Sequence, residues 1–216
     1  MIYKNIKKGI FKERPNRFIA KIEIDGKIET VHVKNTGRCK ELLIDGCEVI
    51  LSKSDNQSRK TKYDLIAVYK KGLGLVNIDS QAPNYVVKEW LEKQGYDIVK
   101  PEYFYGNSRL DFYCQKGDEK TLIEVKGCTL EKDGIGYFPD APTLRGTKHL
   151  KELKKAVEEG YKACIIFAIQ MENVFEVRAN KETDPAFANA LLEACQAGVE
   201  IICLTCEIRE NEIKIG

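Results

Sequence analysis

Two acidic residues and a lysine lie on either side of one turn in the sequence. Asp111 is in the apolar segment 108–114, Glu124 and Lys126 are in the segment 120–126, and the best turn sequence between them is Gly117-Asp118. If Gly117 and Asp118 form a two-residue hairpin loop, the register of the two strands is fixed. Asp111 then lies directly opposite Glu124, with Cβ atoms ~4.5–5.5 Å apart on one face of a sheet.

The same register places Arg109 opposite Lys126. It also leaves a second face made only of apolar side chains, which we expect to be core. The residues of that face are Leu110, Phe112, Cys114, Ile123 and Val125.

Two carboxylates that face each other repel, and an ordinary solvent-exposed face does not require such a pair. A divalent cation turns this repulsion into coordination, because Mg²⁺ binds one or two carboxylates together with waters and phosphate oxygens. A lysine beside it, here Lys126, can stabilise phosphate charge or orient a water. The alternative is a solvated ion-pair network in which Arg109 and Lys126 neutralise Asp111 and Glu124.

The segments around this hairpin predict an α/β domain. The order after residue 81 is helix, three strands, helix, strand, helix, strand, which is typical of a mixed sheet between helices. The strands are expected at 96–104, 108–114, 120–126, 162–169 and 200–208, and the helices at 85–94, 144–159 and 185–197.

Residues 1–80 have a different pattern, of short strands. Alternating apolar residues at 17–24 and 28–33 flank the hairpin turn Asp25-Gly26, and further strands are expected at 48–52, 64–69 and 73–78. With a short helical stretch at 38–43, this predicts a small barrel of the OB type. We therefore expect two domains, 1–80 and 81–216, with the break at 80–84.

Charge is distributed unevenly between these halves. The chain has a net charge of +2, but residues 1–80 contain 17 basic and 10 acidic residues and the remainder is net negative. A basic barrel is typical of proteins that bind a polyanion such as DNA, although a solvated basic surface is the simpler alternative. The candidate DNA contacts are Arg14, Arg17, Arg38, Arg59 and Lys60.

Composition excludes several classes of protein. The 216 residues are 43% hydrophobic and 31% charged, and the longest apolar run, 163–171, is far shorter than the ~20 residues of a membrane span. Three of the eight cysteines, Cys114, Cys164 and Cys203, lie among strand-like apolar residues, which predicts reduced thiols and a cytoplasmic protein. The pair Cys203 and Cys206 is a CxxC, but on a strand its members face opposite sides, which argues against a zinc site.

The arrangement of Asp111, Glu124 and Lys126 resembles the active-site motif of the PD-(D/E)XK, or restriction-endonuclease-like, superfamily. A wider set of motifs resembles the SfsA (sugar fermentation stimulation protein A) family along essentially the whole chain. These motifs are Arg14-Pro-Asn-Arg-Phe18, Asn35-Thr-Gly-Arg38, Gln81-Ala-Pro-Asn84, Ser108-Arg-Leu-Asp-Phe112, Glu124-Val-Lys126, Phe138-Pro-Asp-Ala141 and Arg145-Gly-Thr-Lys-His-Leu150.

This resemblance implies an OB-like domain, a nuclease-like domain with a mixed sheet, and a bacterial DNA-binding protein linked to sugar-utilisation genes. It places Asp111 and Glu124 at metal positions, with Mg²⁺ or Mn²⁺ as the expected cofactor, and Lys126 at a catalytic position. Asp140 and His149 are further catalytic candidates, and Arg145 is a further DNA contact. Each has a structural alternative, since Asp140 could cap a helix and His149 could be a buried structural histidine.

Two residues are weaker candidates for the same site. Glu89 could be an accessory acid or only an exposed helix residue. Gln170 ends a buried strand, where some nucleases of the superfamily carry a glutamine, but Val174 stands where a tyrosine partner would be expected.

Two functions therefore remain open. One is a divalent-metal-dependent nuclease, and the other is a non-catalytic, largely non-sequence-specific DNA-binding regulator of sugar (maltose) metabolism. A small-molecule enzyme is not favoured, because the sequence has no glycine-rich nucleotide-binding motif and only two histidines. DNA is the expected partner, a membrane is not, and no small-molecule cofactor or oligomeric state is predicted.

Overall fold

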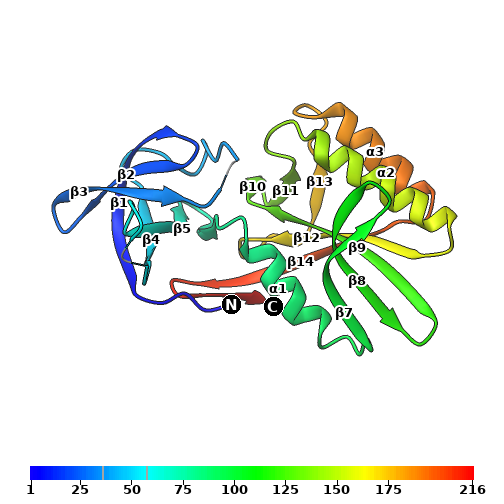
Figure 1. The fold of residues 1–216 in the computed structure, drawn as a ribbon. Coiled ribbons are helices and arrows are strands. Elements are labelled where there is room, and N and C mark those ends of the chain that lie inside the picture. Colours follow the sequence, from blue (N-terminus) through cyan, green and yellow to red (C-terminus); the bar gives the residue numbers. More distant parts are fainter. Residues whose placement is uncertain (36, 57) are drawn as a thin grey trace.

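The chain forms a β-barrel followed by a mixed sheet with three helices, which confirms the predicted architecture (Figure 1). The computed structural model describes residues 1–35, 37–56 and 58–216. Thr36 of the Asn35–Arg38 motif lies outside the described residues. Within the described ranges, no helix is long and apolar enough to cross a membrane.

The barrel contains five strands that close on themselves. β1 pairs with β2 and with β4, β2 pairs with β3, and β4 pairs with β5. A short parallel pairing of β3 with β5 completes the barrel, and β6 extends the sheet from β5. The bounds are β1 Ile6–Asn16, β2 Ile19–Ile24, β3 Lys27–Val33, β4 Glu48–Lys53, β5 Tyr63–Lys70 and β6 Gly74–Asn77.

Alternation explains β2 and β3, whose inward residues Ala20, Ile22 and Val31 are buried. The expected helical stretch at 38–43 is wrong: the segment forms turns. The left-handed backbone at Cys39 (φ 46°) is incompatible with a helix, and the turns place Leu42 and Leu43 in the barrel core.

The second sheet has the order β15-β14-β12-β9-β8-β7. Its central strands β9, β12 and β14 are parallel, and β7 and β8 are antiparallel to their neighbours. The bounds are α1 Ala82–Leu91, β7 Ile98–Tyr105, β8 Ser108–Lys116, β9 Glu119–Cys128, α2 Leu144–Glu158, β12 Lys162–Ile169, α3 Pro185–Gln196, β14 Glu200–Arg209 and β15 Glu212–Ile215.

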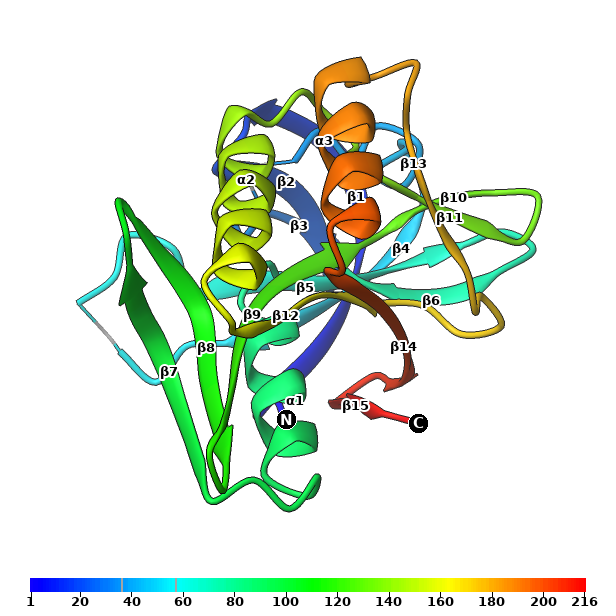
Figure 2. The same cartoon turned by 90° about the vertical axis from the view of Figure 1, so that its right-hand side faces the viewer.

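Helices cover both faces of this sheet. α1 packs on one face through Val87 and Leu91, and α2 and α3 pack together on the other (Figure 2). A small third sheet lies beside β9, with strands β10 Leu130–Lys132, β11 Ile135–Phe138 and β13 Val177–Ala179.

The β8–β9 hairpin has the predicted register, but only in part. Pairing runs from Lys116–Glu119 to Phe112–Ile123, and beyond this point β8 and β9 diverge, as Figure 2 shows. The expected Arg109–Lys126 opposition is therefore wrong, and Asp111 and Glu124, one position beyond the last pair, are not paired across the two strands either. Leu110 also leaves the predicted apolar face: it packs with the α2–α3 core, whereas Phe112 packs with α1.

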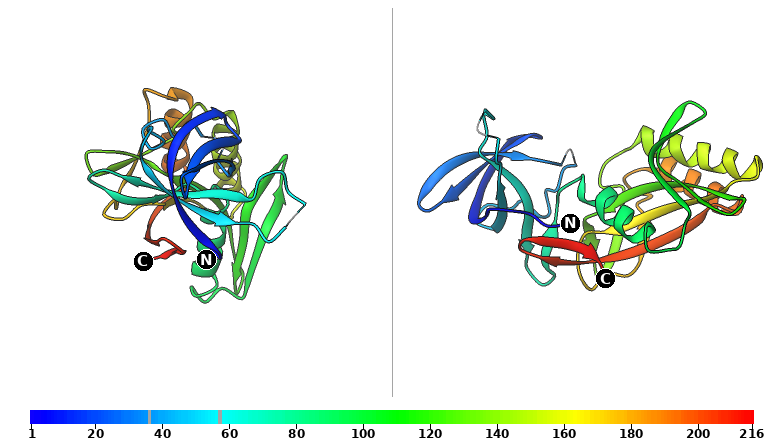
Figure 3. Two further views of the ribbon diagram at one scale, coloured as in Figure 1. Left: turned by 90° about the vertical axis from the view of Figure 1, so that its left-hand side faces the viewer. Right: turned by 60° about the horizontal axis from the view of Figure 1, so that its bottom comes forward.

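The two halves of the molecule share a core. Residues 1–3 pair with β15, through Met1 N to Ile213 O (2.8 Å) and Tyr3 N to Asn211 O (2.8 Å), and the two ends of the chain lie near each other (Figure 3). Tyr3, Ile50 and Ile66 pack against Ile208 and Ile213 in one buried cluster.

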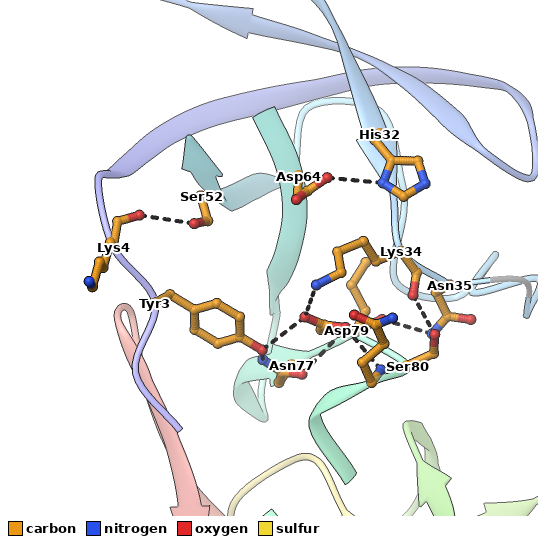
Figure 4. A network of polar contacts seen from close by, with 12 residues as sticks. Tyr3, Lys4, His32, Lys34, Asn35, Ser52, Asp64, Asn77, Asp79 and Ser80 are labelled. Carbon is orange, nitrogen blue, oxygen red and sulfur yellow. Dashed lines mark hydrogen bonds and ion pairs between the residues drawn. The ribbon is translucent and has the colours of Figure 1, made fainter. Parts of the chain in front are cut away.

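A polar network around Asp79 joins the same halves (Figure 4). Asp79 is fully buried, and its Oδ2 accepts from Lys34 Nζ (2.8 Å) and from the Tyr3 hydroxyl (3.3 Å). Its Oδ1 accepts from the backbone N–H of Gln81 (2.9 Å) at the start of α1. The network fixes the position from which α1 begins.

Candidate functional site

Asp111 lies at the fork where β8 and β9 separate. Its Oδ2 accepts from the backbone N–H of Val125 (2.8 Å), so the side chain replaces a bond of the interrupted strand pairing. Its Oδ1 accepts from Asn84 Nδ2 (2.8 Å) in the first turn of α1. Both donors are neutral, so they orient the carboxylate without balancing its charge, and nearby Lys126 offsets that charge only in part.

Glu124 lies on the adjacent strand and is only 2% exposed. Its Oε1 accepts hydrogen bonds from Lys126 Nζ and from Nδ1 of His149 (2.5 Å), a residue of α2. Its Oε2 is buried and has no hydrogen-bond partner among the described residues. A buried carboxylate oxygen without a partner is costly, because buried polar atoms are almost always hydrogen-bonded.

The two carboxylates have opposite pKa shifts. Burial and the neighbouring charge of Glu124 raise the pKa of Asp111. Burial alone would raise the pKa of Glu124 as well, but the bonds from His149 and Lys126 outweigh it, and the pKa of Glu124 is lowered. Glu124 is therefore ionised at neutral pH, and because an ionised carboxylate only accepts, His149 donates to it.

These residues fit a divalent cation in donor type. Asp111 and Glu124 supply hard carboxylate oxygens, and Glu124 Oε2 is an oxygen for which the fold provides no donor. Within the described part of the chain, no group of three or more His, Cys, Asp or Glu side chains could hold a metal. A cation here would use these two carboxylates and complete its shell with backbone, water or phosphate oxygens, as Mg²⁺ commonly does.

Three hollows connect the site with the barrel. The first, of about 400 Å³, contains Asp111, Ser80 and Asn84 on its wall. The second, of about 200 Å³, shares Ser80 and Asn84 with the first and reaches Gly37 of the barrel. The third, of about 420 Å³, shares Gly37 and is lined by basic residues. Because neighbouring hollows share wall residues, the three lie in a row from the basic loops of the barrel to Asp111, and we call this row the groove.

The predicted DNA contacts fall into two groups. The guanidinium of Arg14 donates to the carbonyls of Arg17, Asn35, Gly37 and Arg38. That of Arg59 is paired with Asp64. These two arginines organise loops. In contrast, Arg17, Arg38, Lys60 and Arg145 are exposed, and Arg17 and Arg38 line the basic end of the groove.

Of the remaining candidates, one contacts Glu124 directly, and the other three have partners elsewhere. His149 contacts Glu124 directly. Asp140 lies in the second hollow, where its Oδ2 accepts from the backbone N–H of Arg38 (3.1 Å). Gln170 donates to Asn77 Oδ1 (2.8 Å) and to the Asp79 carbonyl (3.0 Å). Glu89 pairs with the amino group of Met1 (3.2 Å) and is half exposed.

Sequence reasoning missed three contributors to this site. Asn84 was named only as part of the Gln81–Asn84 motif, without a role in the site, and the backbone N–H of Val125 has no sequence signal. Gly127 lets the chain approach closely: a Cβ there would lie 2.3 Å from Gln170 Oε1 and 2.8 Å from the Pro83 ring. The one available signal was a glycine directly after Glu124-Val-Lys126.

Comparison with known proteins assigns both halves to one class of protein. A family model described as "SfsA N-terminal OB domain" matches residues 13–78. A second, "Sugar fermentation stimulation protein RE domain", matches residues 81–212. The fold and site thus define a protein with an OB barrel followed by an RE domain. The chain belongs to the SfsA, or sugar fermentation stimulation protein, family.

Relatives agree along the whole length. The chain is 53% identical over 219 residues to a sugar fermentation stimulation protein homolog of Desulfitobacterium hafniense, and 54% identical to that of Ruminiclostridium cellulolyticum, covering 100% of this chain and 96% of each relative. A solved structure, "The structure of Pyrococcus Furiosus SfsA in complex with Ca2+", superposes with a TM-score of 0.90 at 31% identity. It covers 100% of this chain and 95% of that one.

Proposed function

We propose that the chain is a cytoplasmic DNA phosphodiesterase that depends on a divalent cation, Mg²⁺ or Mn²⁺, bound at Asp111 and Glu124. The observation that carries this proposal is the buried, unpartnered Oε2 of Glu124 beside an Asp111 whose pKa is raised by burial and by Glu124. A fold that buries two repelling carboxylates gains stability when a cation binds between them. The Ca²⁺ named with the Pyrococcus furiosus relative supports a divalent site in a protein of the same fold.

The residues around the carboxylates have separate tasks in this proposal. When bound, the cation supplies positive charge that stabilises negative charge developing on a phosphodiester. Asn84 and the Val125 N–H hold Asp111, and His149 holds Glu124. Lys126 lies at the same carboxylate as a point charge that can stabilise the attacked phosphate or orient a water.

The groove supports DNA as the substrate. Exposed Arg17 and Arg38 lie at its barrel end, and Asp111 lies at the other. Cationic side chains neutralise phosphates without reading sequence, so they would position a strand along the groove.

A nuclease assay combined with thermal melting tests the proposal. Wild-type protein is incubated with single-stranded, duplex and branched DNA in Mg²⁺, in Mn²⁺ and in EDTA. We expect cleavage only with a divalent cation, together with a cation-dependent rise in melting temperature. Asp111→Asn should abolish both effects. Lys126→Ala should keep the melting shift but lose cleavage, because its task concerns the transition state.

Cleavage that is equal in EDTA and Mg²⁺, or a Lys126→Ala variant that cuts normally, would contradict the proposal.

The second candidate is a non-catalytic DNA-binding regulator of sugar metabolism. It is favoured by the exposed basic end of the groove, which can bind phosphates without Asp111. A protein that cuts no DNA form and does not respond to cations would support it. DNA affinity should then fall with salt by a log–log slope of about −0.9 per phosphate neutralised on a duplex, and the slope should shrink in an Arg17→Ala/Arg38→Ala variant.

A further inference from the structure

The middle hollow of the groove differs chemically from its two neighbours. It is lined by Tyr137, Leu130 and Pro83 and by acidic or amide side chains including Asp140 and Gln170. Phe138 also borders it, but the Phe138 ring packs into the α2–α3 core. No lysine or arginine lines it, within the residues that the structure describes. β11, which contributes Tyr137 and Phe138 to the hollow, lies on the side of the second half that is nearer to the barrel (Figure 1). Such a lining disfavours a phosphate and suits a flat ring with polar edges.

Its size agrees with one ring system. The hollow measures about 200 Å³. A closed apolar cavity of roughly 150 Å³ holds benzene, so this volume accepts a nucleobase but not a base pair.

Two oxygens face the hollow with capacity to accept. Gln170 is 2% exposed, and its Nε2 is used by Asn77 and Asp79, but its Oε1 receives no hydrogen bond from the described residues. Asp140 uses Oδ2 to accept from Arg38, and its Oδ1 likewise receives none from that part of the chain. A ligand that satisfies both must bring N–H donors.

Two glycines let the two accepting side chains lie directly against the backbone at the wall of the hollow. A Cβ on Gly127 would lie 2.3 Å from Gln170 Oε1, and a Cβ on Gly37 would lie 2.4 Å from Asp140 Oδ2. Both glycines lack a left-handed φ, so the turn geometry does not require them. Their common effect is to leave the room that the Gln170 and Asp140 side chains occupy.

From these observations we infer that the hollow binds one unstacked nucleobase of a single-stranded DNA, with preference for a base that carries an exocyclic amine over thymine. The inference rests on the proposed function for the location of the phosphodiester. Asn84 and Val125 line the hollow and also hold Asp111, so the base sits next to the position at which the backbone is cut. A base can reach it only from a single strand or after leaving its duplex.

The test measures binding, so it does not depend on cleavage. Lys126→Ala protein in EDTA is titrated with fluorescein-labelled dT12, with dT12 containing one central dC, and with dT12 containing one central abasic site. We expect the dC strand to bind roughly tenfold tighter than dT12, since a good carboxylate–amine contact is discriminating on this scale. Equal affinity of the dC and dT12 strands would overturn the inference.

Two variants locate the effect. Asp140→Asn should present an amide N–H in place of an acceptor, so the preference for dC should disappear or turn toward thymine. Asp133→Asn, an exposed residue in the β10–β11 turn of the same hairpin, should retain the preference. Retention of the dC preference in Asp140→Asn would overturn the assignment.

Gly127→Ala places a methyl group where Gln170 Oε1 lies, so it should displace this acceptor and reduce the affinity for the dC strand to that of the abasic strand. A melting scan accompanies this variant. If it does not fold, Tyr137→Ala, which removes the aromatic wall, is measured in its place with the same expected loss. A protein that binds dC selectively but never cuts DNA would keep the base site and refute the nuclease.

Discussion

Asp79 and Asp111 are two carboxylates near the start of α1, and they differ in how their hydrogen bonds and charges are satisfied. Asp79 accepts from an ammonium, a hydroxyl and a backbone N–H, and Lys34 balances its charge. Asp111 accepts from two neutral donors and faces Glu124, one of whose oxygens has no partner in the described residues. The completed network joins the halves, whereas the incomplete one is where we propose that a cation binds. A buried carboxylate whose charge is not balanced is thus a better guide to function than one whose charge is balanced.

The largest expected effect comes from breaking the completed network. Asp79→Ala leaves the Lys34 ammonium, which is 21% exposed, without its partner. We expect the free energy of unfolding to fall by about 3 kcal/mol, because removing one member of a buried pair strands the other charge. Urea denaturation measures the loss. Asp25→Ala, which breaks the exposed pair with Lys7, is the control and should change stability by less than about 0.5 kcal/mol.

The second effect concerns a basic residue that is structural. Arg14→Ala should lower the free energy of unfolding by about 2 kcal/mol, because four backbone carbonyls lose a charged donor. Arg17→Ala removes an exposed side chain from the same loop and should leave stability nearly unchanged while weakening DNA binding. Equal stability of the two variants would show that Arg14 does not organise the loop.

Substitution of Asp111 should change stability in the opposite direction to substitution of Asp79 or Arg14. Because the pKa of Asp111 is raised by burial and by Glu124, its ionised form costs stability at neutral pH. Asp111→Asn should therefore raise the free energy of unfolding without cations by about 1 kcal/mol, or a few degrees in melting temperature. The gain should shrink as the pH falls through the raised pKa, where wild-type Asp111 becomes neutral. The turn variant Asp118→Asn is the control, and a destabilised Asp111→Asn would contradict this account.

The smallest effect is a pH dependence in the barrel. Burial alone would raise the pKa of Asp64, but the bonds from Arg59 and His32 outweigh it, and the pKa is lowered. The ionised group therefore contributes stability that is complete above the unfolded pKa of about 4 and is lost as pH falls through the lowered folded pKa. Asp64→Asn should be less stable than wild type at neutral pH by about 1 kcal/mol or less. Melting scans should converge at acidic pH, and a constant difference would contradict the assignment.

Strong local patterns made part of the fold predictable. The strand 162–169 was expected with the bounds that it has, because its apolar residues are continuous, and Gly117-Asp118 fixed the hairpin register. β1 was missed because its segment contains five charged residues among eleven. β10, β13 and β15 have only three or four residues, which is too short for a recognisable pattern, and β13 also depends on a partner that is distant in sequence, β11.

The site was predictable where like charges faced each other and not where the backbone contributed. The proximity of two like charges, Asp111 and Glu124, could be predicted from the hairpin sequence alone. The divergence of β8 and β9 could not be predicted from it, because the divergence depends on α1 and α2 packing on opposite faces of the sheet. The donors Asn84 and Val125 N–H, and the room that Gly37 and Gly127 leave for Asp140 and Gln170, likewise depend on the three-dimensional packing.

The shared core has a consequence for how the molecule unfolds. Tyr3, Ile50 and Ile66 of the barrel half are buried against Ile208 and Ile213 of the last two strands, so separating the halves would expose apolar surface on both. The two family domains are therefore one cooperative unit. Calorimetry should record a single heat-absorption peak whose calorimetric and van't Hoff enthalpies agree, where independent domains would give two.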